Sequence, residues 1–160
     1  MRLETALRLR LEFLSRVVQK EAQYLQETAD RLFVAPLTPD ALKRISDDSL
    51  LAERLDAFVS RFGRLQDTLT DKFLPALLDA MAEPKASAIE NLDRAEKLAW
   101  IDSTDEWLEL RKLRNQMIHE YIEDLVVLSS ALMSGQRFVS KLSSATEVFV
   151  ANAKRRIEAS

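Results

Sequence analysis

The amino-acid sequence predicts an all-α protein, an antiparallel bundle of four or five major helices in a single domain over residues 1–160. The 160-residue chain holds only two glycines and four prolines, so turn-forming residues are rare. Leu, Ala, Glu, Arg and Lys dominate the composition, and these side chains favour helices. Apolar residues recur at steps of three and four along three long segments, which is typical of helices with one buried face.

The first half of the chain predicts two long helices joined by a short one. Leucines at helical spacing predict the first helix over residues 2–33. Pro36 and Pro39 then force an extended connection, and a short helical piece follows at 40–46. The second long helix carries leucines and phenylalanines at alternating steps of four and three. It is expected to kink or end near Pro75, which has no N–H to donate. Its possible N-caps are Asp47, Asp48 and Ser49.

The second half predicts three further helices. One covers about residues 87–99. Ser103 and Glu106 form a capping box, which predicts that the next helix begins there and carries the tryptophan at position 107 on its buried face. The last helix is expected to begin near Asp124 and to continue almost to the C-terminus.

Composition excludes several classes of function. The chain has no cysteine, which excludes disulfides and thiolate catalysis, and only one histidine. We find no metal-ligand motif and expect no cofactor, and Gly63 and Gly135 are too isolated to form a phosphate-binding loop. No apolar run approaches the ~20 residues of a membrane span, so we expect a cytoplasmic protein with no membrane contact. The net charge of -3 argues against non-specific coating of nucleic acid but allows a local basic site.

The segment from Arg114 to Tyr121 is the part of the sequence most suggestive of chemistry. On an ideal helix, Leu113 and Met117 share the buried face, whereas Arg114 and His119 lie about 140° apart. These two side chains would converge on one ligand if the helix deforms near His119, or if two copies of the helix meet across a two-fold axis. A symmetric dimer would also supply a second imidazole to the same cleft.

Arg114, His119 and Tyr121 fit an Arg-x4-His-x-Tyr pattern, and Asn115 directly follows the arginine. This pattern resembles the signature of HEPN-domain proteins, in particular the HepT-like toxins. The likeness covers most of residues 50–124. Two further stretches share it: Ser60-Arg61-Phe62-Gly63-Arg64-Leu65-Gln66-Asp67 and Asp105-Glu106-Trp107-Leu108-Glu109-Leu110-Arg111.

The resemblance implies a fold, an activity and a partner. HEPN domains are helical bundles that usually form homodimers with the motif in a cleft at the interface, and many are metal-independent endoribonucleases. HepT-like toxins are paired with a minimal nucleotidyltransferase antitoxin (MNT), which can transfer adenylate to the motif tyrosine, here Tyr121. The resemblance therefore implies the toxin ribonuclease of a HepT/MNT toxin–antitoxin pair.

The expected chemistry is internal transesterification of RNA. His119 has a reference pKa of about 6.5, which suits proton transfer near neutral pH. Arg114 would clamp the phosphate and stabilise its developing charge with a planar fork of N–H groups. Arg111 and Lys112 could follow the RNA backbone, and Asn115 could orient the imidazole or bind the ribose.

Two alternatives to the ribonuclease remain open. Some relatives are regarded as substrate-binding subunits of the nucleotidyltransferase, without catalysis of their own. A helical adaptor with no chemistry is also compatible with the sequence, and its motif would then be a dimer contact. We interpret Arg61, Arg64 and Asp67 as an ion-pair network or a dimer contact, and Tyr121 is otherwise a half-buried packing residue.

Overall fold

The computed structural model describes residues 2–84, 86–119 and 123–160. Every regular element in these ranges is a helix, so the predicted helical bundle is confirmed for this part of the chain. In chain order the helices are α1 (Thr5–Leu32), α2 (Pro39–Leu42), the 3-10 helix η1 (Lys43–Ser46), α3 (Ser49–Asp67), the π-helix η2 (Thr68–Phe73), α4 (Leu74–Ala80), α5 (Ala88–Lys97), α6 (Thr104–His119) and α7 (Leu125–Glu158).

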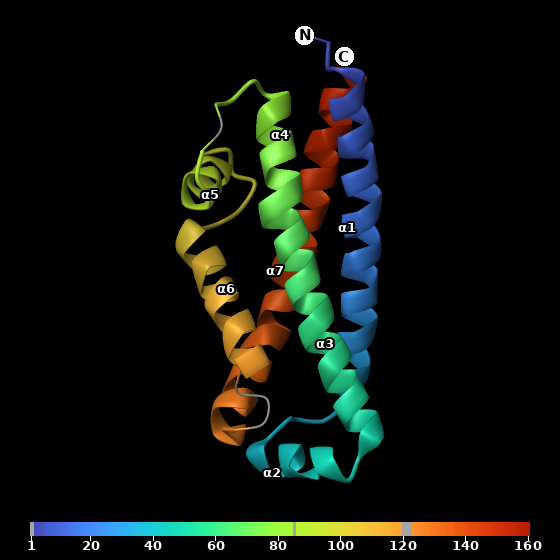
Figure 1. Cartoon of the computed structure of the whole chain (residues 1–160), viewed down its shortest axis with the longest axis vertical. Coiled ribbons are helices and arrows are strands. Elements are labelled where there is room, and N and C mark those ends of the chain that lie inside the picture. Colours follow the sequence, from blue (N-terminus) through green and yellow to red (C-terminus); the bar gives the residue numbers. More distant parts are fainter. Residues whose placement is uncertain (1, 85, 120–122) are drawn as a thin grey trace.

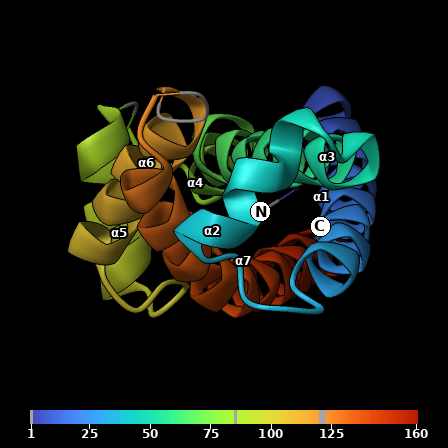
Figure 2. The ribbon, with the colours of Figure 1, turned by 90° about the horizontal axis from the view of Figure 1, so that it is seen from below.

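The long helices run alternately along one axis (Figure 1). Helix α1 packs against α3 and α7, and α6 packs against α7. α3, η2 and α4 follow one another without a break and run back along α1. The short α2 lies across one end of the bundle, as the view along the axis shows (Figure 2). Chains that reverse direction through short connections bury their apolar stripes against each other, which is the physical basis of an antiparallel bundle.

The buried faces of the helices form one hydrophobic cluster. Its largest fully buried side chains are phenylalanines, and Phe73 packs edge to face against Phe149 with ring centroids 5.9 Å apart. Trp107 is buried, as the sequence predicts, and Trp100 is buried as well. Gly135, in the middle of α7, lets that helix approach α3 closely, because a Cβ there would lie 3.3 Å from the ring of Phe58.

The helix starts follow the capping signals in the sequence. The carboxylate of Asp48 accepts a hydrogen bond from the backbone N–H of Leu51 at 3.0 Å and begins α3. The Ser103 hydroxyl accepts from the N–H of Glu106 at 3.3 Å, and α6 begins there. Asp124 caps α7. These three boundaries agree with the predictions because capping depends on side chains that are neighbours in sequence.

Pro75 does not end its helix, contrary to one of the two predicted outcomes. The chain remains helical to Ala80, and the change of geometry falls just before the proline, where η2 has π-helical hydrogen bonding. Pro75 lies in the first turn of α4, directly after the π-helix, and proline is tolerated in the first turn of a helix. No helix in the described ranges is long and apolar enough to cross a bilayer.

Candidate functional site

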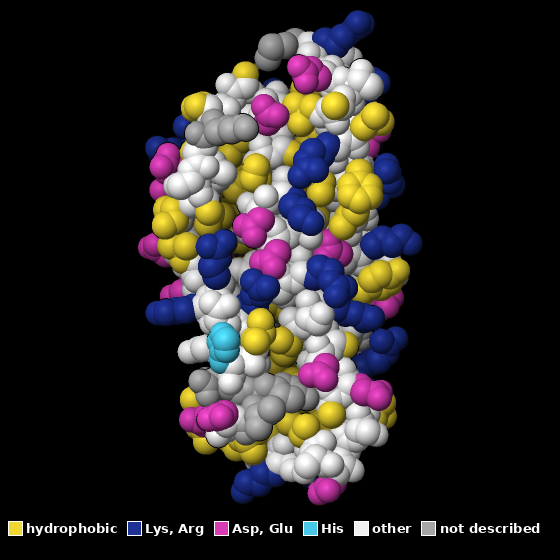
Figure 3. Space-filling model, in the orientation of Figure 1, with side chains coloured by type: hydrophobic (Ala, Val, Ile, Leu, Met, Phe, Trp, Pro, Cys, Tyr) yellow, Lys and Arg dark blue, Asp and Glu magenta, His cyan; other side chains and the backbone are white. Residues whose placement is uncertain are grey.

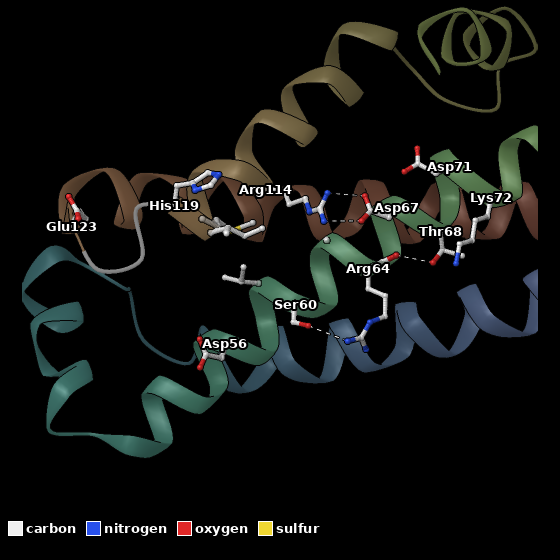
Figure 4. A pocket seen from close by; sticks show the side chains of 14 residues that line it. Asp56, Ser60, Arg64, Asp67, Thr68, Asp71, Lys72, Arg114, His119 and Glu123 are labelled. Atoms are coloured by element: carbon white, nitrogen blue, oxygen red, sulfur yellow. Dashed lines mark hydrogen bonds and ion pairs between the residues drawn. The ribbon is translucent and has the colours of Figure 1, made fainter. Parts of the chain in front are cut away.

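A large open cavity lies between α3–η2 and α6 (Figure 4). We call it the site cavity; its volume is about 1090 Å³. The residues that line it are Asp56, Val59, Ser60, Gly63, Arg64, Asp67, Thr68, Asp71, Lys72, Arg114, Met117, Ile118, His119 and Glu123. Both residues that the sequence assigns to catalysis, Arg114 and His119, are among them.

Arg114 makes a two-pronged ion pair with Asp67 across the site cavity. Its Nη1 donates to Oδ1 of Asp67 at 3.0 Å, and its Nη2 lies 2.9 Å from Oδ2. The Arg114 and Asp67 side chains are 30% and 39% exposed, so solvent screens this pair only in part. The fork that the sequence analysis assigned to a phosphate is therefore already engaged in this structure. Each terminal nitrogen keeps one outer N–H for a ligand.

Gly63 provides the space in which the Arg114 side chain lies. A Cβ at position 63 would lie 2.7 Å from Nε of Arg114 and 3.3 Å from its Cδ. The Nε atom is buried and has no hydrogen-bond partner in the described structure. Gly63 and Asp67 are one helical turn apart on α3, so one face of that helix provides both the space and the charge that hold Arg114.

His119 is exposed and lies at the end of α6, at the opposite end of the site cavity from Lys72 (Figure 4). Although Arg114 and His119 leave α6 at different angles, both line the site cavity, because the cavity extends from one side chain to the other. Near His119 the wall is partly apolar: Met117 is buried, whereas Ile118 is 47% exposed. This end of the cavity therefore combines a proton-transfer group with an exposed apolar surface.

The charges around the site cavity are mixed rather than uniformly basic. Three cations line it, Arg64, Lys72 and Arg114, together with four carboxylates: Asp56, Asp67, Asp71 and Glu123. Burial raises the pKa of Asp67, and the neighbouring guanidinium of Arg114 opposes that rise. A polyanion bound here would meet favourable charge only where a cation is not already neutralised by a carboxylate.

A buried carboxylate lies behind the wall of the site cavity. Both oxygens of Glu21, on α1, are buried and lack a hydrogen-bond partner in the described structure. Burial raises the pKa of Glu21, while Thr68, Arg64 and Lys72 act to lower it. The hydroxyl of Thr68 donates to the carbonyl oxygen of Arg64 at 2.9 Å, so its single proton is not then free for Glu21.

The predicted supporting residues lie outside the site cavity. Arg111, Lys112 and Asn115 are exposed on α6, and none of them lines it. Arg111 instead lies 3.5 Å from the carboxylate of Asp71. Tyr121, the predicted modification site, falls outside the described residues.

Arg61, Arg64 and Asp67 do not pair with one another in the described structure, and their alternative interpretation as a dimer contact stays a prediction. Asp67 pairs with Arg114, Arg64 donates to Ser60 Oγ at 3.3 Å, and Arg61 donates to the carbonyl oxygen of Tyr24 at 3.2 Å. These three side chains lie at different angles around α3 and therefore face different neighbours.

Sequence analysis missed the roles of Gly63, Asp67 and Glu21. A glycine within a predicted helix signals a close approach, because glycine costs about 1 kcal/mol relative to alanine there. Nothing in the sequence pairs Asp67 with Arg114, which are 47 residues apart. The described residues hold no cluster of three or more histidines and carboxylates able to bind a metal ion.

Comparison with protein-family models, with curated proteins and with solved structures finds no match. Function can therefore be inferred only from the site itself and from the motif that occupies it.

Proposed function

We propose that this protein is a HEPN-type toxin endoribonuclease that cleaves RNA without a metal ion, at a cleft formed by two copies of the chain. The observation that supports this most directly is that Arg114 and His119, five residues apart on α6, line one large cavity. An arginine and a histidine beside one ligand-sized space supply charge stabilisation and proton transfer, the two requirements of transesterification.

The reaction needs two proton transfers. One imidazole takes the proton of the ribose 2′-OH, and the 2′-oxygen attacks the adjacent phosphorus. Arg114 stabilises the added negative charge on the phosphoryl oxygens. The bond from phosphorus to the 5′-oxygen breaks, and a second imidazole gives that oxygen its proton. The products are a 2′,3′-cyclic phosphate and a 5′-hydroxyl.

The proposed mechanism uses two imidazoles, and this requirement leads us to propose a two-fold dimer. The chain has one histidine, so a single copy cannot supply both the base and the acid as imidazoles. Ile118, next to His119 and exposed, provides apolar surface at the mouth of the site cavity for a second copy to cover.

Neutralisation by a minimal nucleotidyltransferase is the regulatory part of the proposal. The phenol oxygen of Tyr121 would attack the α-phosphate of ATP, and pyrophosphate would leave. The added adenylate would occupy the space that RNA needs and would compete for Arg114. Incubation with a minimal nucleotidyltransferase and ATP should add one adenylate to Tyr121 and abolish toxicity. A Tyr121→Phe protein that is still modified and neutralised would exclude this acceptor.

A second candidate function is a non-catalytic binding subunit of the nucleotidyltransferase. The Arg114–Asp67 pair favours it, because an arginine already engaged by a carboxylate is less available to a scissile phosphate. A cleavage assay distinguishes the two functions.

The decisive experiment is cleavage of single-stranded RNA by the purified protein, with and without EDTA. We expect cyclic-phosphate products whose formation is unaffected by the chelator. Arg114→Ala and His119→Ala should each abolish cleavage while the protein keeps its helical circular dichroism. Loss of activity with EDTA, or activity that survives in both variants, would refute the assignment. No cleavage under any condition would favour the binding subunit.

A further inference from the structure

Three cations lie along one face of the molecule without an ion-pair partner among the described residues: Arg10 on α1, Arg64 on α3 and Lys72 on η2. All three are exposed. Figure 3 shows Lys and Arg side chains in a band down the middle of this face, with Asp and Glu side chains among them.

Two neighbouring hollows connect these cations. Arg64 and Lys72 line the site cavity. Arg10 and Lys72 line a second cavity, of about 470 Å³, between α1 and the η2–α4 segment. Lys72 and Asp71 belong to both, so the two hollows adjoin. A ligand that leaves the site cavity past Lys72 therefore enters a space lined by Arg10.

Three carboxylates along this path pair with arginines of α5 and α6, whereas Asp56, Asp79 and Glu123 make no ion pair in the described structure. Asp67 pairs with Arg114 and Asp71 with Arg111. Arg94 pairs in the same way with Glu83. Arg10, Arg64 and Lys72 have no such partner in the described structure, so a phosphate that binds them displaces no ion pair.

Helix α1 adds an exposed aromatic ring one turn after Arg10. Phe13 is 55% exposed and lies three residues after Arg10, so the two side chains are neighbours on the helix surface. Cations that follow a backbone, combined with an exposed ring for a base, are typical of surfaces that bind single-stranded nucleic acid. A folded duplex offers no free base face to such a ring.

We propose that Arg64, Lys72 and Arg10 form a cationic track that binds the phosphates of single-stranded RNA outside the cleavage site, with Phe13 stacking on a base beside Arg10. The inference rests on the proposed function, since the RNA would be the substrate of the site cavity. It replaces the predicted contacts of Arg111 and Lys112, which lie outside that cavity. The track extends the site from one scissile phosphate to several nucleotides.

The test measures binding, so that it does not depend on cleavage. The probe is a 2′-O-methyl RNA of mixed sequence, which has no attacking 2′-OH, bound to the 160-residue chain over a range of salt concentrations. The variant is Arg10→Ala with Arg64→Ala and Lys72→Ala. Three lost phosphate contacts should lower the salt slope of log K by about 2 and weaken binding roughly 100-fold at 0.1 M salt. Phe13→Ala should weaken binding without changing the slope.

The matched control removes the same charge elsewhere, with Arg137→Ala, Lys154→Ala and Arg156→Ala on α7. Equal weakening by both triple variants would mean that only net charge matters and would overturn the track. Unchanged RNA binding by the track variant would also overturn the track. If the variant's oligomeric state changes while its RNA binding does not, this face would be assigned to contact between copies. Track-dependent binding without any cleavage would keep the track and reject the ribonuclease.

Discussion

Gly63 lies directly against the side chain of Arg114, so that a Cβ on Gly63 would be 2.7 Å from Nε of the arginine. Real Cβ atoms do not approach another heavy atom so closely, and one of the two must move when the glycine is replaced. The clash involves the far end of a flexible side chain, so the arginine would move and the backbone of α3 would stay.

Gly63→Ala should therefore impair the proposed RNA cleavage without lowering the stability of the fold. Alanine favours the helix by about 1 kcal/mol, so the melting temperature should hold or rise, whereas Arg114 loses its place beside Asp67. We expect RNA cleavage to fall as it does in Arg114→Ala, and the NMR signal of the Arg114 side-chain N–H to shift. Gly135→Ala is the control, because its neighbours are Phe58 and Met117. An active Gly63→Ala protein with an unshifted signal would contradict this role.

Asp67→Asn should lower the rate of the proposed RNA cleavage, because it weakens the ion pair that holds Arg114 in position. The amide offers one acceptor oxygen in place of two, so the guanidinium is no longer fixed at both terminal nitrogens. A misplaced catalytic side chain costs roughly 10- to 100-fold in kcat, with little change in KM. Asp71→Asn is the matched control, since it removes the same charge one turn along but lies beside Arg111. A faster Asp67→Asn enzyme would mean that Asp67 competes with the phosphate instead of orienting Arg114.

Glu21→Gln should stabilise the protein at neutral pH and change how its stability depends on pH. Burial raises the pKa of Glu21 in the folded chain, so between the ordinary and the raised pKa the native state binds more protons than the unfolded chain does. The stability of the natural protein therefore falls as pH rises from the ordinary carboxyl range through the raised pKa. The variant should gain on the order of 1 kcal/mol at pH 7, the size of one unmet polar group, and gain less at pH 4.

Urea denaturation at several pH values measures this difference. The exposed carboxylate of Glu53, on α3, gives the control variant Glu53→Gln. If the difference in free energy of unfolding between the natural chain and Glu21→Gln did not depend on pH, or if Glu21→Gln were less stable at pH 7, the ionised Glu21 carboxylate would not be destabilising the fold.

Ile118→Asp should convert the proposed dimer into a monomer. Ile118 is 47% exposed beside His119, and an aspartate there would place a charge in the surface that a second copy covers. Sedimentation should show a dimer for the natural chain and a monomer for the variant, with cleavage lost in parallel. Ile89→Asp on α5, also an exposed isoleucine, is the control. A natural chain that sediments as a monomer at micromolar concentration would reject the dimer itself.

The long helices, and the capped starts of α3, α6 and α7, could be predicted from the sequence alone. The apolar period that predicts residues 2–33 corresponds to α1, Thr5–Leu32, and the capping side chain of Asp124 marks the start of α7. Both signals are local, because a helix is stabilised by neighbours within one or two turns. The sequence also singled out Arg114 and His119 as a motif, but it did not show which residues surround them in the fold.

Packing of α6 against α3 decided what surrounds Arg114. Asp67 and Arg114 are 47 residues apart, and their pair exists only because α6 packs against α3 with the Arg114 side chain lying over Gly63. The same packing left Arg111, Lys112 and Asn115 outside the site cavity and made Arg64 and Lys72 part of its lining. Spacing along one helix fixes the angle at which a side chain leaves it, whereas the neighbour it meets is fixed by the other helices of the bundle.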